Sequence, residues 1–171
     1  AGTSTGSQSL EIATYNITEQ TNVNEWNGIY SGAIMNANII IREYGTANPW
    51  YAGISRVLLA MNAGVATDMW GDVPLSEASL GQSGNLTPKY DNQEDVLKGI
   101  QALLDQAIID LGRDASANAL FPGVDDLIYG GDVSLWLKTA YALKARYANR
   151  LSQRDPSGSA TAALAAVGNA Y

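Results

Sequence analysis

The sequence predicts an all-α fold built from stacked antiparallel helical hairpins. Apolar residues recur every three or four positions over several long segments, and no segment alternates apolar and polar residues as a half-buried strand does. Glycine and proline fall between these segments, where helices are expected to end. At 171 residues and 46% hydrophobic composition, the chain has enough material for one domain with a real core.

The first two helices are predicted from periodicity and their ends. Apolar positions follow helical spacing from Asn24 to Tyr44, and Gly45 ends the pattern. Asn48 and Pro49 suit the N-cap and first turn of a second helix. Its expected inner face consists of Ile54, Val57, Leu58, Met61, Val65 and Met69. The short connection between the two helices predicts an antiparallel hairpin.

The second helix is expected to end at a structural exit motif. Gly71 has the freedom to take a positive φ after a helix, and Pro74 prevents the helix from continuing. Asp72 is expected to accept hydrogen bonds from loop amides at this exit. Residues 71–90 are polar and rich in glycine and proline, so we expect them to drape over the surface as a long loop.

Three further helices follow. Asp91 and Glu94 have the spacing of a capping box for a third helix, which Gly112 ends. Its expected inner face consists of Val96, Leu97, Ile100, Leu103, Leu104, Ile108 and Leu111. Asp132 is expected to cap a fourth helix, with Trp136, Ala140, Leu143, Tyr147 and Leu151 on one face. A fifth, alanine-rich helix is expected from about Ser159, with Leu164 and Val167 facing inward.

Paired helices with small residues at contact positions indicate a tetratricopeptide-like solenoid, although no strict repeat of about 34 residues is present. We assign residues 24–171 to this helical domain. Residues 1–23 are rich in Ser, Thr, Gly and Gln, and are expected to form a flexible N-terminal lead. A new helical pattern is developing at Tyr171, so we expect the domain to continue beyond it.

Four ordered motifs resemble the SusD/RagB family, the nutrient-binding outer-membrane lipoproteins of Bacteroidetes. They are Trp26-x-x-x-Tyr30 with Asn38-Ile39-Ile40, the Gly71-Asp72-Val73-Pro74 helix exit, the helix start Pro88-x-Tyr90-Asp91-x-Gln93-Glu94, and Asp126-x-Ile128-Tyr129-x-Gly131-Asp132-x-x-x-Trp136. The similarity spans roughly residues 24–155. Tyr141 and Ala145 depart from the family pattern, which affects the expected local packing of the fourth helix.

The resemblance implies a non-catalytic protein of the cell surface that binds glycan or another oligomeric nutrient. It implies a SusC-type TonB-dependent transporter as partner and a lipid anchor at the outer membrane. The anchoring cysteine is not among these residues, and we expect it to have been removed with the leader. An alternative is a helical-repeat scaffold that binds only proteins, since the concave surface of a solenoid suits that role. An anchoring cysteine and a neighbouring transporter gene would favour nutrient capture.

The amino-acid composition excludes several kinds of partner and catalytic site. Ten basic and seventeen acidic residues give a net charge of −7, which disfavours nucleic acid as a partner. The chain has no cysteine and no histidine, so thiol catalysis, disulfides and the commonest metal ligand are excluded. No apolar run approaches the roughly 18 residues of a membrane span. We expect no cofactor and no metal.

Two acidic clusters have both a chemical and a structural interpretation. Asp68, Asp72 and Glu77 resemble a carboxylate pair for glycoside hydrolysis, but a hydrogen-bonded Asp72 and a solvated Glu77 explain the pattern as well. A cluster in the later loop offers oxygen ligands for a hard cation, although a helix cap and a turn are the favoured roles. It consists of Asp125, Asp126 and Asp132.

Aromatic residues are the main candidates for ligand contact, because sugars stack their apolar ring faces on Trp and Tyr. Trp26 and Trp136 follow helical periodicity and are expected in the core. Four others stand at helix ends or in the N-terminal lead, where half-exposed rings are common. The predicted ligand-binding residues are Tyr15, Trp50, Tyr51 and Trp70.

Overall fold

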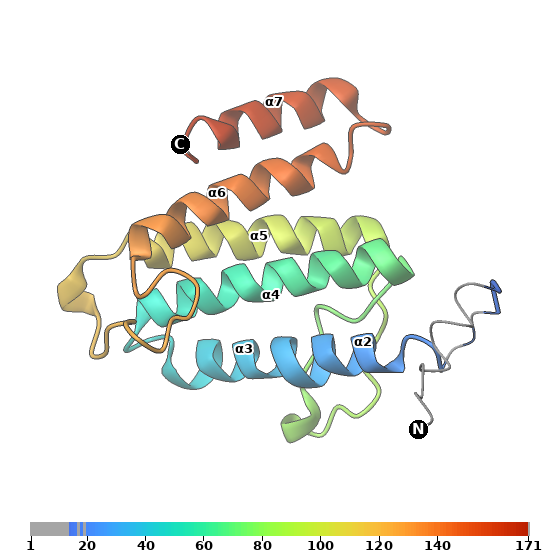
Figure 1. Ribbon diagram of the computed structural model, residues 1–171, viewed down its shortest axis with the longest axis horizontal. Helices are drawn as coiled ribbons and strands as arrows, with labels where there is room; N and C mark the ends of the chain where they lie inside the picture. The colour runs from blue at the N-terminus through green and yellow to red at the C-terminus, as the bar shows by residue number, and fades with distance from the viewer. Residues whose placement is uncertain (1–13, 17, 19, 171) are drawn as a thin grey trace, which may run out of the picture.

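The computed structural model describes residues 14–16, 18 and 20–170, and in this part of the chain the fold is all-α, as predicted. Residues 1–13, 17 and 19, most of the predicted N-terminal lead, lie outside the described residues. Figure 1 shows the helices stacked in order, from α2 and α3 at one edge through α4, α5 and α6 to α7 at the other. Consecutive helices pack on one another, which gives the expected tetratricopeptide-like series of hairpins.

The first predicted helix is one continuous helical stretch with two π-helical segments. It consists of α2 (Val23–Asn27), η1 (Gly28–Ile34), α3 (Met35–Ile39) and η2 (Ile40–Tyr44). Ile29 and Ile34, five residues apart, are both buried. This spacing fits the i→i+5 bonding of a π-helix, which usually appears as a short insertion and often at functional sites.

Helix α4 (Pro49–Trp70) begins at Pro49 with Asn48 at its N-cap position, as predicted, but the Asn48 side chain makes no capping hydrogen bond. The Asn48 side chain accepts a 2.8 Å hydrogen bond from the Leu120 amide and donates to the Tyr44 carbonyl. The Trp50 amide in the first turn donates instead to Oδ1 of Asn118, at 2.9 Å. Two asparagines thus attach the N-terminus of α4 to the loop before α6. Local capping rules do not predict such contacts between distant segments.

The predicted inner face of α4 is only half right. Ile54 and Val57 are buried, but Met61, Val65 and Met69 are exposed. The buried face is lined mainly by small residues, namely Ala52, Gly53, Ala60, Ala63, Gly64 and Ala66. Small residues let neighbouring helices approach closely, so α5 and α6 pack on this side and leave the larger residues outside.

The exit from α4 connects directly to the start of α5 (Gln93–Leu111). Gly71 has a φ of 76° and its amide donates to the Thr67 carbonyl. Oδ1 of Asp72 accepts a 2.9 Å hydrogen bond from the Gln93 amide, one of the amides that a helix start leaves without an internal partner.

The predicted capping box of Asp91 and Glu94 is wrong. Asn92 is the N-cap of α5, and its side chain accepts from the Asp95 amide. The helix therefore begins one residue later than expected, which moves Glu94 out of the position that reaches back to a cap. Glu94 instead forms ion pairs with Lys98 and Arg154.

The predicted inner face of α5 is confirmed, with Leu103 and Ile108 half-buried and the other five residues buried. In α6 (Val133–Asn149), Asp132 accepts from the amides of Ser134 and Leu135, and Trp136 is buried, both as predicted. In α7 (Pro156–Val167) the expected inward positions are wrong, because Leu164 and Val167 are exposed while Ser159 and Ala166 face α6. Small residues again make the contact between neighbouring helices.

Candidate functional site

The connector between α4 and α5 is closed at its base. Val73 and Asp91 exchange two backbone hydrogen bonds of 3.1 Å, so residues 74–90 form a lobe whose ends are held together. The Asp91 carboxylate accepts from the amides of Leu75 and Ser76 at 3.0 and 2.7 Å. We call residues 73–91 the connector lobe.

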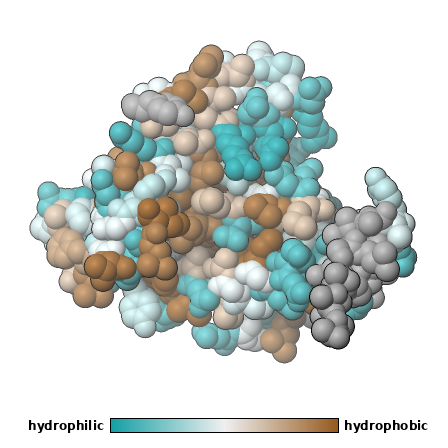
Figure 2. All heavy atoms as spheres, in the orientation of Figure 1, coloured by the Kyte–Doolittle hydropathy of each residue, from teal (hydrophilic) through white to brown (hydrophobic). Residues whose placement is uncertain are grey.

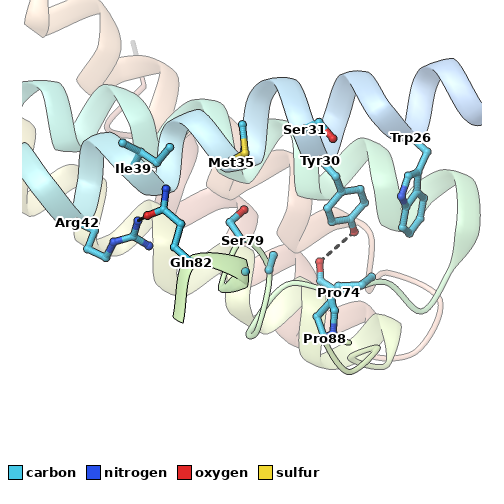
Figure 3. A pocket seen from close by; sticks show the side chains of 12 residues that line it. Trp26, Tyr30, Ser31, Met35, Ile39, Arg42, Pro74, Ser79, Gln82 and Pro88 are labelled. Atoms are coloured by element: carbon cyan, nitrogen blue, oxygen red, sulfur yellow. Dashed lines mark hydrogen bonds between the residues drawn. The ribbon is translucent and has the colours of Figure 1, made fainter. Parts of the chain in front are cut away.

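A groove lies between the connector lobe and the helical stretch from α2 to η2. Figure 3 shows its two walls, with Met35 and Ile39 on the helix facing Ser79 and Gln82 on the lobe. Its volume is about 480 Å³, within the range of small-ligand sites. The lining residues are Trp26, Tyr30, Ser31, Met35, Ile39, Arg42, Pro74, Ala78, Ser79, Gly81, Gln82 and Pro88. We call this space the aromatic groove.

A cluster of four rings stands at one end of the aromatic groove, and two of them, Trp26 and Tyr30, line it. The ring centroid of Trp26 lies 4.3 Å from that of Tyr30 and 5.1 Å from that of Trp70, which it meets edge to face. Tyr90 of the lobe is nearly parallel to Trp26, at 6.3 Å and 19°. Trp26 and Tyr30 are half-buried and Tyr90 is exposed, so the cluster offers ring surface to a ligand.

Hydrogen bonds fix both ends of the groove. The Tyr30 hydroxyl donates to the Pro74 carbonyl at 2.9 Å (Figure 3), and at the other end Arg42 donates to Oε1 of Gln82 at 3.3 Å. Burial is the main cause that raises the pKa of Tyr30 well above its usual value, and the nearby Tyr90 and Asp91 raise it further. The phenol therefore stays neutral and acts as a hydrogen-bond donor. Arg42 is the one charged residue in the lining and pairs with Glu43.

The lobe wall contains a strained residue. Ser79 has a φ of 64°, a conformation that residues other than glycine seldom adopt. Its side chain points into the groove in Figure 3. The aromatic groove is therefore lined on one side by a π-helical segment and on the other by a strained serine, two features that concentrate at functional sites.

The four residues predicted to contact ligand do not form one site. Trp70 belongs to the ring cluster of the aromatic groove. Trp50 and Tyr51 stand at the opposite end of α4, about 28 to 30 Å from Trp70 at 1.5 Å per residue. Tyr15, with 92% of its surface exposed and a φ of 56°, does not line the groove.

Trp50 and Tyr51 are engaged in holding the loop before α6. The indole Nε1 of Trp50 donates to the Arg113 carbonyl at 3.0 Å, and its ring meets Phe121 edge to face. The Tyr51 hydroxyl donates to Oδ2 of Asp125 at 2.6 Å, which raises the pKa of Tyr51 to about 12. Their bonding is that of structural residues.

The acidic clusters are also engaged in structural hydrogen bonds. Glu77, expected to be solvated, accepts from the Lys89 amide and the Asn85 side chain, and these bonds hold its pKa below the usual value. A general acid needs a raised pKa. Asp68 pairs with Arg150. In the part of the chain that the structure describes, no three acidic residues are grouped so as to hold a metal ion.

The sequence does not point to three residues of the ring cluster as ligand contacts. Trp26 packs against the core, as its periodicity predicts, and it also lies between Tyr30 and Tyr90 in the cluster. The i, i+4 spacing of Trp26 and Tyr30 places both rings on one helix face, which was the available signal. Nothing local places Tyr90 beside them, because its position depends on how the connector lobe folds back.

Comparison with known proteins identifies relatives of this chain. Residues 2–171 match a family model named SusD-like and described as starch-binding associating with outer membrane. Among curated protein sequences, none matches the chain. Over the described residues, no helix combines the length and apolar character needed to cross a membrane.

Several solved structures share the fold. A SusD/RagB family protein from Bacteroides thetaiotaomicron is 35% identical, with a TM-score of 0.78 over 88% of this chain and 31% of its own. A chitin-binding SusD homolog from Flavobacterium johnsoniae is 26% identical, with a TM-score of 0.81 over 94% of this chain and 33% of its own. Another chitin-binding protein is 30% identical, with a TM-score of 0.75 over 90% of this chain and 32% of its own. The chain thus spans about a third of the length of each.

Proposed function

Because this chain belongs to the SusD-like family, we propose that it is part of a cell-surface protein that binds glycans without cleaving them. The aromatic groove is the proposed contact site within this chain. The ring cluster at its end, in which Trp26, Tyr30 and Tyr90 offer ring surface beside Trp70, carries the proposal. Sugar rings stack their C–H faces on such aromatic surfaces, and a few polar groups then fix their orientation. Ser31, Ser79 and Gln82 supply polar groups along the groove.

We propose N-acetylated glycans as the ligand class. Two of the similar structures are of chitin-binding proteins. Beyond the ring cluster both walls of the groove are largely apolar, with Met35 and Ile39 on the helix and Pro74 and Ala78 on the connector lobe. An acetamido methyl group gains from burial against such residues, whereas a hydroxyl in the same place loses its hydration. The lining contains no carboxylate, which fits a neutral ligand.

Capture at the outer membrane, by a lipid-anchored protein working with a SusC-type transporter, is the proposed setting. The family description supports association with the outer membrane. The absence of catalysis is part of the proposal. The carboxylates considered for hydrolysis, Asp72 and Glu77, are both engaged by backbone amides of the connector and α5, which supports a structural role for them.

Isothermal titration with chitin oligosaccharides and with maltooligosaccharides of equal length tests the proposal. We expect tighter binding of the chitin series, and we expect Tyr90→Ala to weaken it at least fivefold. Tyr44→Ala is the matched control, because Tyr44 is 58% exposed against 62% for Tyr90 but is not the residue that stacks on Trp26. Equal loss in both variants would overturn the assignment of the groove. Release of reducing ends during incubation would overturn the absence of catalysis.

A further inference from the structure

A positive charge stands at the end of the aromatic groove away from the ring cluster. Arg42 is the one charged residue among the described residues of the lining, and it lies on η2, sixteen residues after Trp26. Met35, Ile39 and Arg42 follow four- and three-residue spacing, so their side chains share one helix face. Figure 3 shows this face turned towards the connector lobe, with Arg42 beside Gln82.

Two hydrogen bonds hold the Arg42 guanidinium and leave part of it open. Its Nε donates to Oε1 of Glu43 at 2.8 Å, and a terminal nitrogen donates to Oε1 of Gln82 at 3.3 Å. A guanidinium has five N–H groups, so three remain for which no described residue supplies an acceptor. The side chain is 41% exposed, so these groups are accessible to a ligand.

The contact with Arg42 also determines how the Gln82 amide is oriented. Arginine has donors only, so Gln82 presents its oxygen to Arg42 and its NH2 group is left to donate elsewhere. Both residues line the groove. This end of the groove therefore presents hydrogen-bond donors, which match a ligand that brings an acceptor oxygen.

The positive potential at this end comes from Arg42 itself. Half of the ten basic residues belong to α6 and the turn into α7, where Figure 2 shows hydrophilic side chains gathered, and α4 and α5 separate them from the groove. They are Lys138, Lys144, Arg146, Arg150 and Arg154. Lys89 of the connector lobe pairs with Asp91 at 3.3 Å and is not in the lining. The described lining contains no carboxylate, so a cationic ligand meets repulsion there without a compensating partner.

We propose that Arg42 and Gln82 determine the specificity of the aromatic groove, by binding the acetamido carbonyl oxygen of an N-acetylated sugar and rejecting the deacetylated, cationic sugar. This inference rests on the proposed binding of glycans at the groove. The carbonyl oxygen accepts from N–H groups, whereas the ammonium of a deacetylated sugar has donors only and the same charge as Arg42. Two like charges about 4 Å apart in water weaken binding about fivefold, and salt screens this repulsion.

Isothermal titration of the complete gene product measures the preference between a chitin oligosaccharide and its fully deacetylated form of equal length. At pH 5 the amino groups of the deacetylated form are protonated. We expect the wild type to bind the acetylated form at least tenfold more tightly. Arg42→Gln should reduce this preference at least fivefold, because it removes donors for one ligand and repulsion for the other.

Two further variants separate charge from geometry. Arg42→Lys keeps the charge without the planar fork of donors, so it should weaken binding of the acetylated form at least threefold and still reject the deacetylated form. Gln82→Ala also keeps the charge and should weaken binding of the acetylated form alone. Arg113→Gln is the matched control, because Arg113 is exposed, lies outside the groove and alters the net charge equally. Its preference should equal that of the wild type.

An unchanged preference in Arg42→Gln, including an equal loss of affinity for both forms, would overturn the proposal. Equal losses are the result expected if Arg42 only holds the connector lobe in place. Tighter binding of a uronic acid oligosaccharide than of the chitin series, lost in Arg42→Gln, would overturn the assignment to an amide oxygen. Binding of neither form by the wild type would contradict the proposed glycan binding itself, and this inference with it.

Discussion

The indole Nε1 of Trp136 donates a 2.7 Å hydrogen bond to Oδ2 of Asp126, ten residues earlier in the chain. The same carboxylate accepts from the amides of Ile128, Tyr129 and Gly131. Burial raises the pKa of Asp126, but these bonds, led by that of Trp136, outweigh it and hold the pKa below its usual value. One ionised side chain thus joins the loop before α6 to the core.

Asp126→Ala should therefore lower the free energy of unfolding by about 3 kcal/mol, because it leaves a buried indole N–H and several amides without an acceptor. Urea denaturation followed by tryptophan fluorescence measures the loss. Asp125→Ala is the control, since Asp125 is exposed and should cost about 1 kcal/mol or less. Equal losses in the two variants would show that the indole bond adds nothing.

The fold was predictable from the sequence where local rules suffice. The face of α6 that carries Trp136 follows from helical periodicity, and the Asp132 cap follows from its position before that helix. The predictions were wrong where a helix has two apolar faces and packing determines which of them is buried. On α4, the small residues around Gly64 are buried and Val65 is not, which a periodicity of large side chains cannot reveal.

The candidate site was less predictable, because it depends on contacts between distant segments. Trp70 was proposed as a ligand residue from its place at a helix end, and it does lie in the ring cluster. Trp50 satisfied the same rule but is bonded to Arg113 in another loop. The ring cluster also needs Tyr90, which the folding back of the connector lobe brings to Trp26. The spacing of residues along one helix does not predict that the connector lobe folds back onto it.

Replacement of Gly71 should destabilise the protein through the backbone alone. Gly71 has φ 76° and ψ −107°, and a Cβ placed there meets no atom within 4 Å. Gly71→Val should cost about 1 to 2 kcal/mol. Gly71→Asn should cost nearly as much, because asparagine tolerates the left-handed helical region but not this ψ. Both are measured as changes in thermal midpoint, with glycan affinity unchanged.

The matched control for Gly71 is Gly28→Ala. A Cβ at Gly28 also meets no atom within 4 Å, but its φ of −59° is helical. This variant should be neutral or stabilising by up to about 1 kcal/mol. Similar destabilisation at both positions would contradict a backbone origin. Loss of glycan binding in Gly71→Val without a change in melting would show that the α4 exit belongs to the ligand site.

Asp91 should make the protein sensitive to acid. Burial raises its pKa, but hydrogen bonds from the Ser76 amide and hydroxyl and the Leu75 amide outweigh this and lower the pKa from 3.8 to about 2. The unfolded chain therefore takes up this proton first as the pH falls. The stability that Asp91 contributes is complete above about pH 4 and is lost as the pH falls towards 2.

Asp91→Asn should accordingly cost on the order of 1 to 2 kcal/mol at pH 7 and much less at pH 2. Urea denaturation of both proteins at pH 7, 4, 3 and 2 measures the difference. The Asp91→Asn variant keeps part of the acid sensitivity, because other carboxylates such as Asp126 and Asp132 also have lowered pKa values. A difference that stays constant over this range would refute the role of the ionised Asp91.

Ser79→Gly should separate stability from binding. Glycine relieves the strain of a φ of 64°, but it also gives the unfolded chain more conformational entropy. The net increase in the free energy of unfolding is about 0.5 to 1 kcal/mol. If the hydroxyl orients a sugar in the aromatic groove, affinity for chitin oligosaccharides should fall at least threefold while the melting temperature rises. A higher melting temperature with unchanged affinity would show that the strained conformation of Ser79 has no role in glycan binding.

Gly64 of α4 lies directly against the ring of Tyr147 on α6, and a Cβ at this position overlaps the phenol oxygen and two ring carbons. Tyr147 is buried and its hydroxyl donates to the Met61 carbonyl, so the ring has little room to move. Gly64→Ala should therefore cost about 1 to 3 kcal/mol, even though alanine is the better helix former. Gly32→Ala, whose Cβ meets only one atom at 4.0 Å, should not destabilise.

A double-mutant cycle between Gly64 and Tyr147 tests whether the collision is the cause. Tyr147→Leu alone should destabilise by opening a cavity, but Gly64→Ala should cost much less in that background, because the smaller side chain leaves space for the added methyl. We expect a favourable coupling energy of at least about 1 kcal/mol from urea denaturation of the four proteins. Additive losses would mean that Gly64 matters for some reason other than the close approach of α4 and α6.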